Sequence, residues 1–173
     1  EGSPPTAGRK RGVVPPWLTI AKSYVGLKEV PGTALHNPTI IGWLKRYAKN
    51  IGRWGQSRDE TPYCAVFVSH CLAAAGYQGT NHGLAVKYAD WGEQATLKQG
   101  AVVVIRRKRG PNTTGSGRGG YHVAFLWKWN KNFIWLLGGN QRNKVGVNAY
   151  SKKNYDIIAV RWPRDDDRLV SSG

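Results

Sequence analysis

The chain has 173 residues, of which 40% are hydrophobic, and this fits one well-buried domain but is short for two. No apolar run approaches the roughly 20 residues that a membrane-spanning helix needs, so the composition excludes such a helix. The 26 basic and 10 acidic residues give a formal net charge of +16, which predicts a polyanionic partner or surface. Bacterial wall polymers, lipopolysaccharide, anionic lipid and nucleic acid all qualify, and a basic surface that is merely solvated is the plainer alternative.

The first half of the chain carries helical signals. Residues 1–16 hold four of the nine prolines and a basic triplet, so we expect an extended arm there. Apolar spacing predicts a helix over 17–25 that stops at Gly26, and a second helix that opens at Asn37-Pro38. A third helix is expected to run from Thr61, as its N-cap, and Pro62, as its first residue, to Gly76. A short helix is expected over 84–91.

In the second half of the chain the apolar residues recur with the period that is typical of strands. Strands are expected over 101–105, 121–129, 133–137, 145–149 and 157–162, with a long loop over 106–120. Helices followed by strands predict an α+β domain over 17–163, with its N-terminal helices packed on a mostly antiparallel sheet of five to six strands, and a C-terminal tail over 164–173. Trp127 and Trp129 occupy alternate positions of one strand, so we expect them on the same face.

Cys64 is expected in the first turn of the third helix. Unpaired backbone N–H groups and the helix dipole at that end favour a thiolate, which is the nucleophilic form of cysteine. Cys71 would lie about 10 Å further along the same helix, at 1.5 Å per residue. This exceeds the Cα separation of roughly 7 Å that a disulfide tolerates, so both cysteines are expected to be free thiols, with Cys71 in the core.

A base for Cys64 is suggested by a predicted hairpin. If the strands 121–129 and 133–137 are joined by a turn centred on Lys131, then His122 lies opposite Asn140. An Asn oxygen beside a His can orient the ring, and the His can activate the sulfur by proton transfer or as an ion pair. The plainer alternatives are a core cysteine, a structural histidine and an Asn that caps a turn.

Several motifs, in the same order along the chain, resemble those of the CHAP and NlpC-type cell-wall hydrolases, closest to a phage and bacterial subgroup. The nucleophile motif is matched by Asp59-Glu60-Thr61-Pro62-Tyr63-Cys64-Ala65-Val66-Phe67-Val68. The other matching segments are Gly26-Leu27-Lys28-Glu29-Val30-Pro31-Gly32, His36-Asn37-Pro38, Gly120-Tyr121-His122-Val123-Ala124-Phe125, Leu137-Gly138-Gly139-Asn140-Gln141 and Arg161-Trp162-Pro163. Together they span roughly residues 17 to 163.

The resemblance implies a papain-like fold and hydrolysis of an amide bond in peptidoglycan. It assigns the nucleophile to Cys64, the base to His122 and the polar third residue to Asn140. The sequence departs from the family in two places. Gly138 stands where many CHAP domains have a Glu, and Tyr121 replaces a small residue before the His.

Substrate contacts are expected from five residues near these motifs: Glu60, Tyr63, Trp91, Tyr121 and Gln141. Glu60 lies four residues before Cys64, and the plainer interpretation is that it is solvated. The chain has no Cys-x-x-Cys and no His-x-x-x-His pair, so neither a metal site nor a cofactor is expected.

The function expected from these signals is that of a monomeric lytic amidase or endopeptidase, which cleaves the stem peptide or the sugar–peptide link of peptidoglycan. It would act in the bacterial periplasm or cell wall after phage lysis, virion entry or secretion, on an anionic envelope and without needing nucleic acid. Two alternatives stay open: a non-catalytic basic module that binds envelope or nucleic acid, and a toxin-type protease that acts on proteins.

Overall fold

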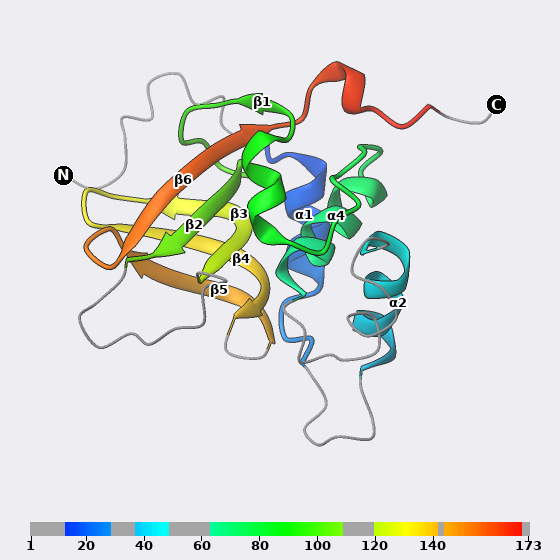
Figure 1. The fold of residues 1–173 in the computed structure, drawn as a ribbon, viewed down its shortest axis with the longest axis horizontal. Coiled ribbons are helices and arrows are strands. Elements are labelled where there is room, and N and C mark those ends of the chain that lie inside the picture. Colours follow the sequence, from blue (N-terminus) through cyan, green and yellow to red (C-terminus); the bar gives the residue numbers. More distant parts are fainter. Residues whose placement is uncertain (1–12, 29–36, 49–62, 109–119, 142–143, 171–173) are drawn as a thin grey trace.

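The computed structural model describes residues 13–28, 37–48, 63–108, 120–141 and 144–170, and for Asn140 and Gln141 it describes the backbone only. Helices fill the first part of the chain and strands the second (Figure 1). The helices, including two short 3-10 helices, are α1 (Pro16–Ser23), α2 (Pro38–Tyr47), α4 (Cys64–Ala74), η1 (Ala85–Asp90) and η2 (Asp165–Asp167). The strands are β1 (Glu93–Gln94), β2 (Val102–Arg107), β3 (Tyr121–Trp129), β4 (Phe133–Gln141), β5 (Lys144–Ser151) and β6 (Tyr155–Trp162).

The strands form one antiparallel sheet in the order β1-β6-β2-β3-β4-β5. The prediction of an α+β domain with a mostly antiparallel sheet is therefore confirmed. Strand β1 pairs only with the end of β6, at Trp162 and Arg161. Its two residues are too few to show a period in the sequence, and the prediction did not include it.

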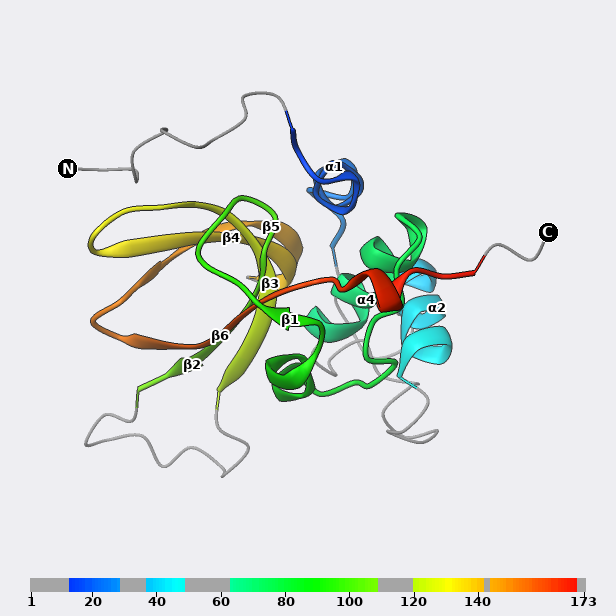
Figure 2. The same cartoon turned by 90° about the horizontal axis from the view of Figure 1, so that it is seen from above.

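The sheet has an apolar core on each face. The helix-facing core lies between the sheet and the helices, where α4 meets Val123, Phe125 and Leu137. The second core contains Ala124 and Leu126 and is surrounded by the strands, which curl around it as Figures 1 and 2 show. We call it the concave core. Neighbouring residues of β3 therefore alternate between the two cores, as strand geometry requires.

Local signals explain where the helices begin and end. Asn37 caps α2, because its side chain accepts hydrogen bonds from the backbone N–H groups of Thr39 (2.9 Å) and Ile40 (3.4 Å). Gly26 and Gly76 follow α1 and α4 with φ of +101° and +90°, a conformation that glycine adopts without strain. Both predicted stop positions are confirmed.

Two expectations about the sheet need correction. The register between β3 and β4 shifts between Leu126 and Lys128 through a β-bulge. Trp127 consequently packs against the helix-facing core and Trp129 against the concave core, so the two rings lie on opposite faces, not on one. Strand β2 also runs on to Arg107, into the stretch predicted as a loop, of which residues 109–119 lie outside the described residues.

The chain after β6 runs back over the end of α4. The backbone N–H of Leu169 donates to the oxygen of Gly76 (2.8 Å), and Tyr77 forms an isolated β-bridge with Arg168. The described part of the predicted tail, up to residue 170, is thus attached to the helical layer. No helix among the described residues is long and apolar enough to cross a bilayer.

Candidate active site

Helix α4 places Cys64 at its first position. Tyr63 is the N-cap, whereas Thr61 and Pro62, the predicted cap and first residue, lie outside the described residues. The helix therefore begins later than expected, but the prediction of Cys64 in its first turn is confirmed. The residues from Cys64 to Ser69 are all buried, because α4 is apolar on every side and lies inside the domain.

The sulfur of Cys64 lies beside the backbone of β3. The side chain is 2% exposed, and burial raises the pKa of the thiol, while hydrogen bonding from the backbone N–H groups of Val123, Ala65 and Cys64 itself acts in the opposite direction. The balance contradicts the expectation that the helix start lowers this pKa. Desolvation is the largest cause of this raised pKa and outweighs the backbone hydrogen bonds, so burial favours the neutral thiol.

The thiol reaches β3 opposite two glycines of β4. Among the described residues, the paired positions of these strands end at Phe125 and Leu137. The next residues of β4 are Gly138 and Gly139, and both lack the space for a side chain. A Cβ on Gly138 would lie 2.5 Å from Cβ of Ala124, and one on Gly139 would lie 2.6 Å from Cε2 of Tyr63. Gly139 thus allows the start of α4 to pack directly on the backbone of β4, and Gly138 allows β4 to pack closely on β3.

His122 occupies the β3 position next to the one that the thiol contacts. It pairs with Ile105 of the concave core, and its ring centroid lies 5.7 Å from that of Tyr150, which packs against the same core. Its side chain therefore lies on the concave side, whereas Cys64 approaches from the helix side. The two side chains approach the same segment of β3 from two sides.

The predicted third residue, Asn140, lies in β4, but its side chain is outside the described residues, as is that of Gln141. The register that underlies its pairing with His122 is confirmed from Phe125 opposite Leu137 to Leu126 opposite Leu136. The pairing of His122 with Asn140 stays a prediction. Glu60 also lies outside the described residues.

Three further predicted contacts have described positions. Tyr63 is fully buried against Gly139 and α4, and Tyr121 is half-buried at the start of β3, with the Arg106 guanidinium 5.2 Å from its ring centroid. Trp91 is only 8% exposed, and its indole N–H donates to the Gln78 oxygen (2.9 Å). Its described contacts are those of a packing residue, and a contact between Trp91 and substrate stays a prediction.

His70 is a polar feature of α4 that the sequence reasoning did not use. Its Nε2 lies 2.9 Å from the Tyr24 hydroxyl and its Nδ1 lies 3.3 Å from the Tyr47 hydroxyl, while the ring stacks on Trp43. Burial, and then the Arg46 charge, lower its pKa. It stands six residues after Cys64, about 9 Å along the helix axis at 1.5 Å per residue, so it is not the base for that thiol.

Cys71, on the same helix, is fully buried, and burial raises its pKa well above the ordinary value. Both cysteines are free thiols, as predicted. In the described part of the chain, no group of three or more His, Cys, Asp or Glu side chains could hold a metal ion.

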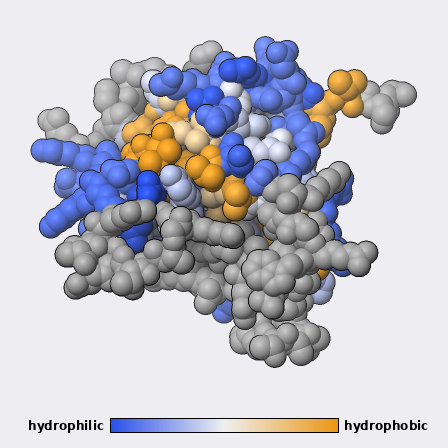
Figure 3. All heavy atoms as spheres, viewed as in Figure 1, coloured by the Kyte–Doolittle hydropathy of each residue, from blue (hydrophilic) through white to orange (hydrophobic). Residues whose placement is uncertain are grey.

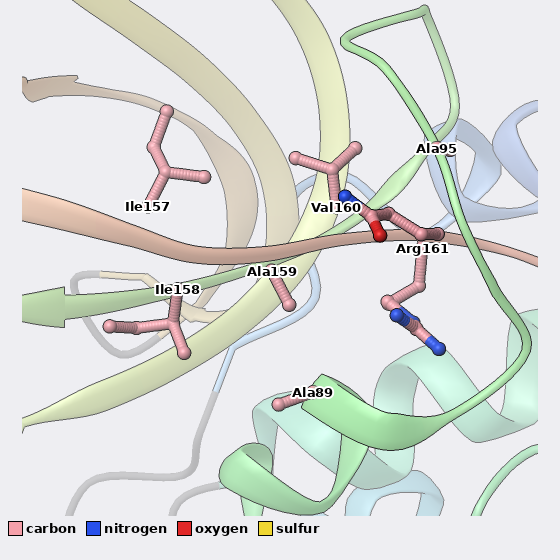
Figure 4. Close-up of a pocket in the computed structure, with 8 residues that line it drawn as sticks. Ala89, Ala95, Ile157, Ile158, Ala159, Val160 and Arg161 are labelled. Carbon is pink, nitrogen blue, oxygen red and sulfur yellow. The ribbon is translucent and has the colours of Figure 1, made fainter.

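A shallow hollow of about 400 Å³ lies away from Cys64, along β6 and η1. Figure 4 shows Ile158 and Ala159 of β6 and Ala89 of η1 around it. Figure 3 shows that an apolar patch with hydrophilic borders lies on this side of the molecule. None of the predicted catalytic residues lines this hollow.

A scan against protein-family models found no match for the chain, and a search of curated proteins found no relative.

Proposed function

We propose that this protein is a cysteine amidohydrolase with a papain-like arrangement, and that it cleaves an amide bond of peptidoglycan. The observation that carries the proposal is the position of Cys64, at the start of α4 and against the Val123 backbone, directly beside His122. The motif resemblance supplies the substrate class. A buried helix that presents a cysteine to an antiparallel sheet, beside a strand that carries a histidine, supports the papain-like interpretation.

The raised pKa of Cys64 favours one of the two modes of activation. A neutral thiol must lose its proton as it attacks, so His122 acts as a general base and not as the partner in a preformed ion pair. Proton transfer requires the imidazole, which lies on the concave side, to move to the helix-facing side, where the sulfur lies. Asn140, in the facing strand, is the proposed group that orients the ring.

The reaction has two balanced halves. The sulfur of Cys64 bonds to the carbonyl carbon while His122 takes the thiol proton, and the oxyanion is stabilised by backbone N–H groups such as that of Cys64. Collapse of the tetrahedral intermediate breaks the C–N bond, and His122 returns the proton to the leaving amine. Water, deprotonated by His122, then hydrolyses the thioester and releases the carboxylic acid and the thiol.

The test is digestion of purified sacculi by three forms of the full chain. The wild-type protein should release soluble muropeptides, Cys64→Ala should release none, and Cys71→Ala should behave as wild type because its sulfur is buried elsewhere on α4. Mass spectrometry of the products identifies the cleaved bond, in the stem peptide or at the sugar. Equal release by wild type and Cys64→Ala would contradict the proposal.

One observation favours a second candidate, a non-catalytic basic module. Cys64 is 2% exposed, so its side chain is almost wholly covered in the folded chain. A purely structural cysteine accounts for this burial directly. If sacculi bind the protein but stay intact, and if Cys64→Ala binds as tightly as wild type, the second candidate is the correct one.

The site of action proposed for the enzyme is the bacterial periplasm or cell wall, which is where its substrate lies. The excess of basic residues, with a net charge of +16, would concentrate the protein on an anionic envelope.

A further inference from the structure

The helix-facing side of the sheet continues beyond the helices over β3, β4 and β5. Figure 2 shows that the strands extend away from the helices toward the hairpin between β3 and β4. On this extension Phe133 and Val147 are 39% and 38% exposed, and Trp135 is half-buried. Trp135 and Phe133 alternate with Leu137 along β4, and Val147 pairs with Leu137, so all three share the face of the helix-facing core.

Strand β3 adds a second tryptophan to this surface, and its β-bulge adds a lysine. Trp127 packs against the helix-facing core, and the next residue, Lys128, pairs with Trp135. An unbroken alternation would have put Trp127 and Trp129 on one face, and the bulge separates them. We call the resulting surface the aromatic–lysine face, and it consists of Lys22, Trp127, Lys128, Phe133, Trp135 and Val147.

Lysine ammonium groups lie over both tryptophan rings of this face. Nζ of Lys128 is 4.7 Å from the ring centroid of Trp135, and Nζ of Lys22, from α1, is 5.8 Å from that of Trp127. The rings of Phe133 and Trp135 are 5.8 Å apart. Cation–π contacts at exposed positions contribute only about 0.5–1 kcal/mol, so an anionic ligand can draw these ammonium groups away from the rings.

Charge is segregated around this face. The acidic residues of the described chain lie on η1, β1, β6 and η2, namely Asp90, Glu93, Asp156, Asp165, Asp166 and Asp167. The described parts of α1, β3, β4 and β5 contain none, whereas they carry Lys22, Lys128 and Lys144. An anionic ligand on the aromatic–lysine face therefore meets attraction from its lysines and no repulsion from the described residues of these four elements.

We propose that the aromatic–lysine face binds an anionic glycan chain, outside the catalytic centre. Sugar rings would lie on Trp127 and Trp135 with their apolar C–H faces, and phosphate or carboxylate groups of the chain would pair with Lys22 and Lys128. The cations of the defined face are lysines, which act as point charges and lack the planar fork with which Arg stacks on bases and reads them. This favours a charged glycan over nucleic acid. The biological source of the glycan is inferred from the proposed function, and in this respect the inference rests on it. The binding itself does not depend on the proposed function.

The test measures binding of the full-length Cys64→Ala protein to sacculi, since this substitution prevents digestion of the ligand. Lys128→Glu should weaken binding at low salt by about tenfold, which corresponds to about 1.4 kcal/mol. Lys98→Glu is the matched control, because Lys98 also lies over a tryptophan (Nζ 3.6 Å from the centroid of Trp162) and changes the net charge equally, but lies outside the face. Trp135→Ala should also weaken binding, and Trp135→Phe should restore part of it.

Two preparations of sacculi distinguish the sources of negative charge. Loss of binding after removal of phosphodiester-linked polymers with hydrofluoric acid assigns the ligand to a phosphate-bearing glycan. Retained binding, still sensitive to Lys128→Glu, assigns it to the carboxylates of the wall glycan itself. Equal weakening by Lys98→Glu and Lys128→Glu overturns the proposal, as does tighter binding to a single-stranded oligonucleotide with the same dependence on Trp135.

Failure of this inference can be told apart from failure of the proposed function. Cleavage of small soluble muropeptides by the protein with Cys64 intact should be unchanged by Lys128→Glu, since they carry no long anionic chain. Absence of cleavage with intact binding refutes the proposed function alone. Unchanged binding by Lys128→Glu with intact cleavage refutes the aromatic–lysine face alone.

Discussion

Gly139→Ala tests whether the contact between α4 and β4 positions the nucleophile. The new Cβ would lie 2.6 Å and 2.7 Å from Cε2 and Cδ2 of Tyr63, and 3.0 Å from Cβ of Phe67. Carbon atoms in contact prefer separations of about 3.5–4.0 Å, so the Tyr63 ring must move by roughly 1 Å. Overpacking of this kind in a well-packed core costs about 1–3 kcal/mol.

Gly146→Ala is the matched control for this substitution. Gly146 is also a buried strand glycine, but the nearest atom to its added Cβ is Cε of Lys144, 4.0 Å away. Urea denaturation should therefore show a loss of about 1–3 kcal/mol for Gly139→Ala and less than about 1 kcal/mol for Gly146→Ala. A double variant with Tyr63→Ala should remove most of the Gly139→Ala cost, because the clashing ring is gone.

The activity of Gly139→Ala is the second readout. Cys64 follows Tyr63 directly, and a misplacement of about 1 Å at a reacting group can reduce turnover by about 100-fold. We expect release of muropeptides to fall much further with Gly139→Ala than with Gly146→Ala at a temperature where both are folded. Equal stability and equal activity of the two variants would refute the reasoning that this contact positions the thiol.

The remaining predictions concern the thiol, a buried histidine and a helix cap. The rate at which iodoacetamide alkylates Cys64, measured in Cys71→Ala, should be low at pH 7 and should rise only above pH 9, because burial raises the thiol pKa above 9.0. Rapid labelling at pH 7 would indicate a preformed thiolate instead. The thermal midpoint should fall as the pH drops below about 6.5, because the pKa of His70 is lowered in the folded state and the unfolded chain then binds more protons. His70→Gln should reduce this dependence on pH more than His82→Gln, because the pKa of His82 is also lowered but its side chain is less buried. If His70→Gln leaves the pH dependence unchanged, His70 is not its cause. Asn37→Ala should cost about 1 kcal/mol in denaturation experiments, since it removes the two hydrogen bonds that cap α2, and Asn37→Ser should retain most of the stability. An unchanged stability of Asn37→Ala would mean that the cap contributes nothing.

Much of the fold follows from local patterns in the sequence. Period and punctuation identified α1, α2 and α4 and the five longer strands, and the span of β3 agrees with its prediction at both ends. Asn37-Pro38, Gly26 and Gly76 act through their own backbone geometry, which does not depend on distant residues. The register at Phe125 and Leu137 agrees with the prediction, but the turn does not set it. Beside the turn Lys128 pairs with Trp135, and the β-bulge then shifts the register by one residue before Leu126 pairs with Leu136.

The candidate site was predictable as a set of residues but not as a geometry. The motif located Cys64 and His122 within one region, and α4 and β3 do meet there. The direction of each side chain depends on which face of β3 the helix covers, and that is decided by packing. The His122 ring packs beside Tyr150 at the concave core, so its position depends on how the whole sheet curves and cannot be predicted from β3 alone.

Local patterns in the sequence predict the order and type of the elements, and they place a cysteine at a helix start. Three features depend on the folded chain as a whole: burial raises the pKa of the Cys64 thiol, Gly139 makes room for the start of α4, and a bulge puts Trp129 on the face opposite to Trp127. The physical reason is the sequence separation over which each interaction acts. Capping and periodicity act between residues a few positions apart, whereas burial, clashes and bulges depend on atoms that only the folded chain brings together.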